Sequence, residues 1–123
     1  MEDWDKQVDI NLKSVFFLTK HIGELMKADR QGKIINISSQ MSAVGYYDRS
    51  VYGTTKGGLT QMTKAFAIEW AEHNINVNAV APTFIETNLT KKMFEDSSFK
   101  EEVLDRIPSV SYTHLTLPTI LRV

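Results

Sequence analysis

Two side chains that could exchange protons stand one helical turn apart near the middle of the chain. Tyr52 and Lys56 are four positions apart, at the start of a stretch whose apolar residues recur every three or four positions. On a helix this spacing places both side chains on one face, about 6 Å apart along the axis. A fixed ammonium stabilises a phenolate, so that the tyrosine hydroxyl can work as a general acid or base. The same spacing also occurs in exposed helical pairs, and the surrounding elements decide between the two interpretations.

Apolar periodicity predicts three helices. The first spans residues 3–28 and the second spans residues 51–73. A third, more polar helix lies near 88–106 and is ended by residues 107–108. The tyrosine–lysine pair therefore lies near the N-terminus of a long helix.

Two short runs rich in β-branched residues predict strands at 33–38 and 75–81. The first run, KIINIS, is typical of a strand buried on both faces. A long helix between two strands forms a crossover connection, which implies parallel strands with helices on both faces of the sheet. The predicted fold class is therefore α/β with a doubly wound parallel sheet, in the order helix, strand, helix, strand, helix.

Polar residues follow both predicted strands. Ser38 and Ser39 end the first strand, and the loop 82–87 follows the second. Ligand sites in open α/β sheets lie at the carboxyl ends of the strands. We therefore expect these residues and the tyrosine–lysine pair to converge on one edge of the sheet.

The composition argues against several classes of function. The chain has 123 residues and a net charge of −1, which removes the main argument for binding nucleic acid or an anionic membrane. There is no cysteine, and His21, His73 and His114 are far apart in sequence, so no metal site is predicted. No apolar run reaches the roughly 18 residues of a membrane span, and the acidic start is unlike a signal peptide. We expect a soluble, cytoplasmic protein.

The chain resembles part of a larger domain. Two strands leave both sheet edges unpaired, which is unfavourable for an isolated sheet. Residues 109–123 contain no acidic residue and a single basic one, Arg122, and the segment SYTHLTLPT resembles a translated sequencing-library adapter. The predicted division is therefore a catalytic part at 1–108 and a non-native tail at 109–123. The alternative for this tail is an ordinary β-hairpin or chain end.

Four segments in this order resemble the short-chain dehydrogenase/reductase family. They are NLKSVF around Asn11, GKIINISS ending at Ser39, YGTTK at 52–56 and INVNAVAPTFIET at 75–87. The resemblance covers residues 1–108 and implies part of a Rossmann-like domain that binds NAD or NADP. No GxGxxG motif, which holds the cofactor pyrophosphate in such folds, occurs anywhere in this chain. The resemblance therefore implies that the N-terminal, cofactor-binding half is missing.

The resemblance also implies roles for four catalytic residues. Tyr52 would exchange a proton with the substrate oxygen, to which Ser39 would also form a hydrogen bond. Lys56 would hold the nicotinamide ribose and favour the phenolate form of the tyrosine. Asn11 would anchor a water that relays protons beyond the lysine.

The loop after the second strand would hold the nicotinamide. By resemblance, Pro82 begins this loop, and the backbone of Ile85 and the hydroxyl of Thr87 would bind the carboxamide of the cofactor, beside Tyr52 and Lys56. These residues form the predicted cofactor-binding set.

The resemblance implies an oxidoreductase that transfers a hydride between NAD or NADP and an alcohol or carbonyl substrate. Thr83 stands where most members have glycine, and the PTFI-x-T pattern resembles that of some sugar-alcohol and hydroxy-acid dehydrogenases, which implies a polyol or a sugar acid as the substrate. A 3-oxoacyl substrate is the other type that the family resemblance leaves open. The parent protein would be a dimer or tetramer of identical subunits. The chain as written would be inactive because it has no phosphate loop.

Two other functions remain open at this point. A nucleotide-sugar epimerase or dehydratase shares the Tyr-x-x-x-Lys pattern, although the serine spacing and the PTFIET loop argue against it. A relative without activity could serve as a binding or assembly half-domain.

Single residues have structural interpretations too. Ser39 could end the strand, Asn11 could be a surface amide, and Thr87 could be the N-cap of the last helix. Four aromatic residues are expected to be packing residues rather than contacts to a ligand: Phe16, Phe17, Phe66 and Trp70.

Overall fold

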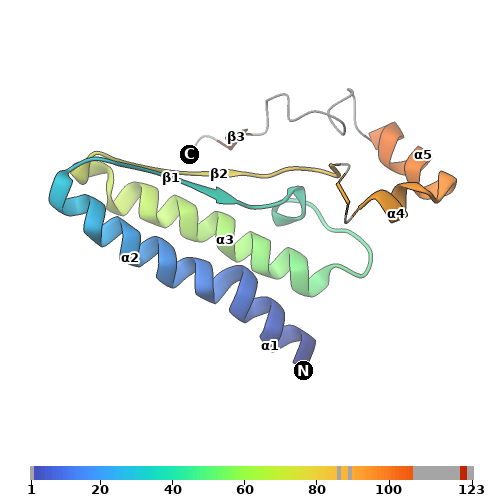
Figure 1. Cartoon of the computed structure of the whole chain (residues 1–123), viewed down its shortest axis with the longest axis horizontal. Helices are drawn as coiled ribbons and strands as arrows, with labels where there is room; N and C mark the ends of the chain where they lie inside the picture. Colours follow the sequence, from blue (N-terminus) through green and yellow to red (C-terminus); the bar gives the residue numbers. More distant parts are fainter. Residues whose placement is uncertain (1, 86, 89, 107–119, 122–123) are drawn as a thin grey trace. The chain divides into compact units, whose positions relative to one another are not determined.

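The computed structural model describes residues 2–85, 87–88, 90–106 and 120–121. The chain divides into two compact units, Met1–Ala81 with Thr119–Val123, and Pro82–Pro118. In the first unit two long helices lie side by side against one face of a small sheet (Figure 1). No helix among the described residues is long and apolar enough to cross a membrane.

The first helical run has an interruption that the sequence did not predict. It consists of α1 (Glu2–Val8), a π-helical turn (Asp9–Lys13) and α2 (Ser14–Asp29). The run ends where Arg30 adopts a left-handed conformation with φ 49°. The predicted helix at 3–28 is thus confirmed in extent. Its π-helical turn is of a kind often found at functional sites, and it contains Asn11.

The sheet confirms the predicted parallel pairing. Strand β1 (Gly32–Ile37) lies parallel to β2 (Ile75–Val80), with Gly32 opposite Ile75. A two-residue strand, β3 (Ile120–Leu121), lies antiparallel on the other side of β2. This strand belongs to the segment predicted to be a non-native tail, of which 109–119 and 122–123 lie outside the described residues.

The prediction that the first strand is buried on both faces is wrong for this chain. The side chains of Ile35 and Ile37 are 64% and 60% exposed, whereas Asn36 between them is buried. Side chains alternate across a strand, and the two long helices cover only one face of β1. The apolar run is therefore half-exposed in the part of the chain that the structure describes.

The second long helix packs its apolar stripe on the sheet. Helix α3 (Ser50–Glu69) is followed by a 3-10 turn (Ala71–His73), so the predicted helix at 51–73 is confirmed except for its tighter last turn. The core contains Leu59, Met62, Phe66, Trp70, Ile75 and Val77. These residues fix α3 on β2 and so determine where the N-terminal turn of the helix lies.

The core closes around one tryptophan. Trp70 is 2% exposed and stacks on Phe66, with ring centroids 4.3 Å apart. Its ring covers Gly23 of α2, where any side chain would collide with it. Phe16 contacts Phe66 from α2, with ring centroids 5.3 Å apart. Phe17 is exposed, and its ring meets that of Phe16 edge to face, with ring centroids 5.5 Å apart, so it packs on its neighbour outside the core.

The described part of the second unit contains two helices where one was predicted at 88–106. They are α4 (Lys91–Phe94) and α5 (Ser97–Arg106). The break occurs because Asp96 caps α5, where its Oδ1 accepts hydrogen bonds from the Ser98 hydroxyl (2.6 Å) and from the Ser98 and Phe99 amides (2.9 and 3.3 Å). The Ser98 hydroxyl, with the two amides, holds the pKa of Asp96 below its usual value. The predicted helix end at 107–108 lies outside the described residues.

Candidate active site

The structure brings the tyrosine–lysine pair together. Tyr52 lies in the first turn of α3 and Lys56 one turn further along, and both side chains are half-buried. The Lys56 Nζ lies 5.7 Å from the centroid of the tyrosine ring. The two side chains thus share one face of the helix, as their spacing predicts.

The ammonium of Lys56 is anchored at the end of the sheet. Its Nζ donates a hydrogen bond of 2.8 Å to the carbonyl oxygen of Ile37, the last residue of β1. Burial lowers the pKa of Lys56 from the ordinary lysine value. The charged group is therefore fixed beside Tyr52 instead of extending into solvent.

Ser39 is buried directly after β1 and caps a short 3-10 turn, Gln40–Ser42. Its Oγ accepts a hydrogen bond of 3.2 Å from the amide of Met41. Since the amide uses an acceptor position, the hydroxyl proton of Ser39 can be donated to another oxygen. The structural interpretation of Ser39 as a cap holds, and it is compatible with a donor role.

Asn11 reaches Tyr52 through an intermediate residue. The Asn11 Nδ2 lies 3.5 Å from the Oγ1 of Thr55, which in turn donates a hydrogen bond of 2.8 Å to the carbonyl oxygen of Tyr52. Thr55 is fully buried, and Asn11 is half-buried and so is not a simple surface amide. The predicted water relay from Asn11 past Lys56 stays a prediction.

The predicted nicotinamide loop belongs to the second unit. There the Oγ1 of Thr90 donates a hydrogen bond of 2.6 Å to the carbonyl of Ile85, and it lies 3.1 Å from the Oγ1 of Thr87. By its backbone the N-cap of α4 is Thr90, whereas the Oγ1 of Thr87 accepts a hydrogen bond of 3.3 Å from the Thr90 amide, the contact that a capping side chain makes. The interpretation of Thr87 as a helix cap therefore holds for its side chain. Pro82 is half-buried. The predicted convergence of this loop with the tyrosine–lysine pair stays a prediction.

Further residues, which were not predicted from the sequence, hold the backbone of the tyrosine–lysine pair in place. Thr55 donates a hydrogen bond to the backbone of Tyr52, and Ser38 donates one to the backbone of Lys56 and is itself hydrogen-bonded to Thr60. A signal was present for Thr55, because a small polar residue three positions after the tyrosine lies on the same inward side of the helix. No comparable signal linked Ser38 to Thr60, which are 22 positions apart.

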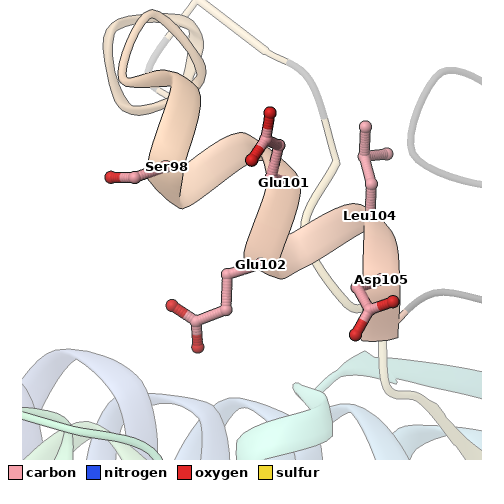
Figure 2. Close-up of a pocket in the computed structure, with 5 residues that line it drawn as sticks. All are labelled: Ser98, Glu101, Glu102, Leu104 and Asp105. Atoms are coloured by element: carbon pink, nitrogen blue, oxygen red, sulfur yellow. The ribbon is translucent and has the colours of Figure 1, made fainter.

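Two surface depressions do not belong to this arrangement. One of about 450 Å³ lies between residues 41–46 and residues 49–54. It is lined by Gly53 and Thr54, which the 100° step of the helix places on sides of α3 other than that of Tyr52. The other depression, about 730 Å³, lies along α5 and carries three carboxylates (Figure 2). Among the described residues no group of histidines and carboxylates could hold a metal ion.

Comparisons with known proteins show the family of this chain. A model of the short chain dehydrogenase family matches residues 1–98. The 2-dehydro-3-deoxy-D-gluconate 5-dehydrogenase of Dickeya dadantii is 40% identical over 109 residues, which are 88% of this chain and 43% of that protein. The 3-oxoacyl-(acyl-carrier-protein) reductase of Thermotoga maritima is 44% identical over 107 residues, which are 87% of this chain and 43% of that protein.

A solved structure shows the same fold. The crystal structure of a gluconate 5-dehydrogenase from Burkholderia cenocepacia, in complex with NADP and tartrate, superposes with a TM-score of 0.83 at 33% identity. The superposition covers 87% of this chain and 42% of that chain, so this chain spans less than half the length of the relatives it matches. The predicted α/β class is confirmed, as part of a Rossmann-like domain. The chain belongs to the short-chain dehydrogenase family.

Proposed function

We propose that this chain is the catalytic part of a longer oxidoreductase that transfers a hydride between NAD or NADP and an alcohol or carbonyl substrate. The observation that carries the proposal is the anchored ammonium of Lys56, 5.7 Å from the ring of Tyr52. Ser39 caps the 3-10 turn that packs against the first turn of α3, where the carbonyl of Met41 approaches Gly53. The phenol of Tyr52, the ammonium of Lys56 and the hydroxyl of Ser39 therefore come from neighbouring elements.

Each group has a role that follows from its chemistry. The Tyr52 hydroxyl exchanges a proton with the substrate oxygen, and the Ser39 hydroxyl donates a hydrogen bond to that same oxygen. An ammonium about 4 Å from a phenolate stabilises it by ~4 kcal/mol at an effective dielectric of 20. Asn11 keeps the turn that carries Tyr52 in place through Thr55.

The residues present fit the nicotinamide cofactor. An ammonium has three N–H donors, and the carbonyl of Ile37 accepts only one of them, which leaves two for the hydroxyls of a ribose. The cofactor, when bound, supplies or accepts the hydride. Pro82, Ile85 and Thr87 are the proposed contacts to its carboxamide. The NADP in the Burkholderia enzyme supports a nicotinamide cofactor for this chain. The proposal does not choose between NAD and NADP.

The names of the relatives narrow the substrate class. One relative is named for 2-dehydro-3-deoxy-D-gluconate and another for a 3-oxoacyl-(acyl-carrier-protein), and both names describe compounds with a carbonyl group on a carbon chain. We accordingly propose a polyol, a sugar acid or a 3-oxoacyl compound as the substrate. An enzyme of such small-molecule chemistry is expected in the cytoplasm.

The isolated chain is expected to show no turnover, because it has no glycine-rich phosphate loop. The measurement is the oxidation of NADH and NADPH by the purified 123-residue chain with a panel of sugar acids and 3-oxoacyl thioesters. Co-expression with a segment that carries such a loop is expected to restore turnover, and a Tyr52→Phe chain in the same mixture is the control. Turnover by the isolated chain would refute this part of the proposal.

We also propose that the parent protein is a homo-oligomer that pairs through its long helices. Leu18, Ile22 and Leu25 recur along one side of α2 and are exposed. Leu18→Glu in the full-length protein is expected to weaken association about tenfold or more, because burying a leucine contributes about 1.5–3 kcal/mol. Sedimentation equilibrium measures the change, with Lys20→Glu, on the opposite side of α2, as the control. Equal dissociation constants for the two variants would refute this interface.

A further inference from the structure

Two consecutive residues at the end of β1 form hydrogen bonds with Lys56, one with its side chain and the other with its backbone. Its Nζ donates to the carbonyl of Ile37 at 2.8 Å. Its own backbone carbonyl accepts a hydrogen bond of 3.3 Å from the Oγ of Ser38. The side chain and the main chain of the lysine are thus tied to the same short stretch of strand.

The hydroxyl of Thr60 completes this contact. The Oγ atoms of Ser38 and Thr60 are 2.7 Å apart. Either hydroxyl can be the donor in this bond, and when Ser38 donates its one proton to the carbonyl of Lys56, Thr60 is the donor to Ser38. The three groups form a chain of hydrogen bonds that joins Thr60, Ser38 and the carbonyl of Lys56.

The peptide between Ile37 and Ser38 is itself fixed by the sheet. The amide of Ser38 donates a hydrogen bond of 2.7 Å to the carbonyl of Val80 in β2. The carbonyl of Ile37 belongs to the same planar peptide, so it cannot turn away from the lysine without breaking this bond. Ser38 is 3% exposed, so water cannot easily replace the contacts of its hydroxyl.

We propose that Ser38, acting with Thr60, is a positioning residue that sets the distance between the end of β1 and the turn of α3 that carries Lys56. The bond from Ser38 holds the turn where the ammonium reaches the carbonyl of Ile37 beside Tyr52. This inference rests on the proposed function for its catalytic meaning, but the placement of the ammonium can be measured without turnover.

Loss of the Ser38 hydroxyl is expected to free the lysine turn. The ammonium then gains water, and since burial is what lowers the pKa of Lys56, that pKa moves up toward the ordinary lysine value. The measurement is a pH titration of the Lys56 side chain by NMR in the 123-residue chain, with the signal assigned by its loss in Lys56→Arg. Ser38→Ala is expected to raise the titration midpoint.

The control is a buried hydroxyl in the same layer that does not touch the lysine. The Oγ1 of Thr63 accepts a hydrogen bond of 3.0 Å from the Nδ2 of Asn36, one residue before Ile37. Thr63→Val is expected to lower the unfolding temperature and to leave the titration of Lys56 unchanged. A shift of equal size in this control would overturn the proposal, because any loosening of the layer would then suffice.

The other end of the bond gives an independent pair of variants. Thr60→Val removes the hydroxyl that binds Ser38 and is expected to shift Lys56 in the same direction as Ser38→Ala. Thr60→Ser keeps a hydroxyl and is expected to retain the wild-type midpoint. If Ser38→Ala fails to fold, the comparison of Thr60→Val with Thr60→Ser tests the proposal in its place. A wild-type midpoint in folded Thr60→Val would overturn the proposal, whereas the proposed function would fail separately, through turnover that does not need Tyr52.

Discussion

Replacing Tyr52 with phenylalanine in the full-length protein is expected to lower kcat/KM by a factor of about 10²–10⁴, the usual contribution of a general acid or base. The ring and its packing remain, and only the hydroxyl that exchanges the proton is lost. Cofactor binding is expected to persist, because Lys56 keeps its anchor on the carbonyl of Ile37. Steady-state kinetics and the quenching of tryptophan fluorescence by NADPH measure the two effects separately.

The matched control for this variant is Tyr47→Phe. Tyr47 is 81% exposed in the loop before α3, and its hydroxyl is not part of the proposed site. Its loss is expected to leave kcat/KM within about twofold of wild type, since exposed substitutions away from special features have small effects. If Tyr52→Phe also kept its turnover, the alternative of a non-catalytic binding or assembly half-domain would become the better account.

Replacing Trp70 with alanine is expected to have the largest effect on stability. The ring is 2% exposed, stacks on Phe66 and covers Gly23, so its loss leaves a cavity between both long helices. Truncation of a buried tryptophan costs about 3–5 kcal/mol of the free energy of unfolding. Domains are stable by only about 5–15 kcal/mol, so such a loss is expected to leave the chain close to unfolding at room temperature. Urea denaturation followed by circular dichroism measures the change.

A double-mutant cycle tests whether the contact with Gly23 is responsible. Gly23→Ala alone is expected to destabilise the chain, because the new methyl group collides with the ring of Trp70. In the Trp70→Ala background the same substitution is expected to be neutral or stabilising, since the cavity accepts the methyl group. Additive effects of the two substitutions would show that the ring does not rest on Gly23.

The sequence predicted those parts of the fold that depend on local patterns. Helical periodicity located both long helices, and the β-branched runs located the two parallel strands. The exposure of Ile35 and Ile37 could not be predicted, because a run of apolar residues does not show whether a second layer covers the strand. The break between α4 and α5 did have a signal, since Asp96 followed by two serines is a helix start.

For the candidate site, too, the sequence predicted only what depends on local spacing. The spacing of Tyr52 and Lys56 predicted that both side chains lie on one helix face, as they do, whereas the catalytic roles of these residues and of Ser39 stay predictions. The π-helical turn around Asn11 had no visible pattern in the sequence. The bond between Ser38 and Thr60 joins residues from different elements, and only the packing of α3 on β1 brings them together.

The most direct test of the central claim follows the hydride itself. The full-length protein is incubated with NADPH or NADH that is deuterated at the transferring position, together with a carbonyl substrate, and the alcohol is analysed by mass spectrometry. The proposed site predicts one deuterium in the product of the wild-type protein and a rate lower by about 10²–10⁴ for Tyr52→Phe. No deuterium in the product, or equal rates for the two proteins, would contradict the assignment of the catalytic site to this chain.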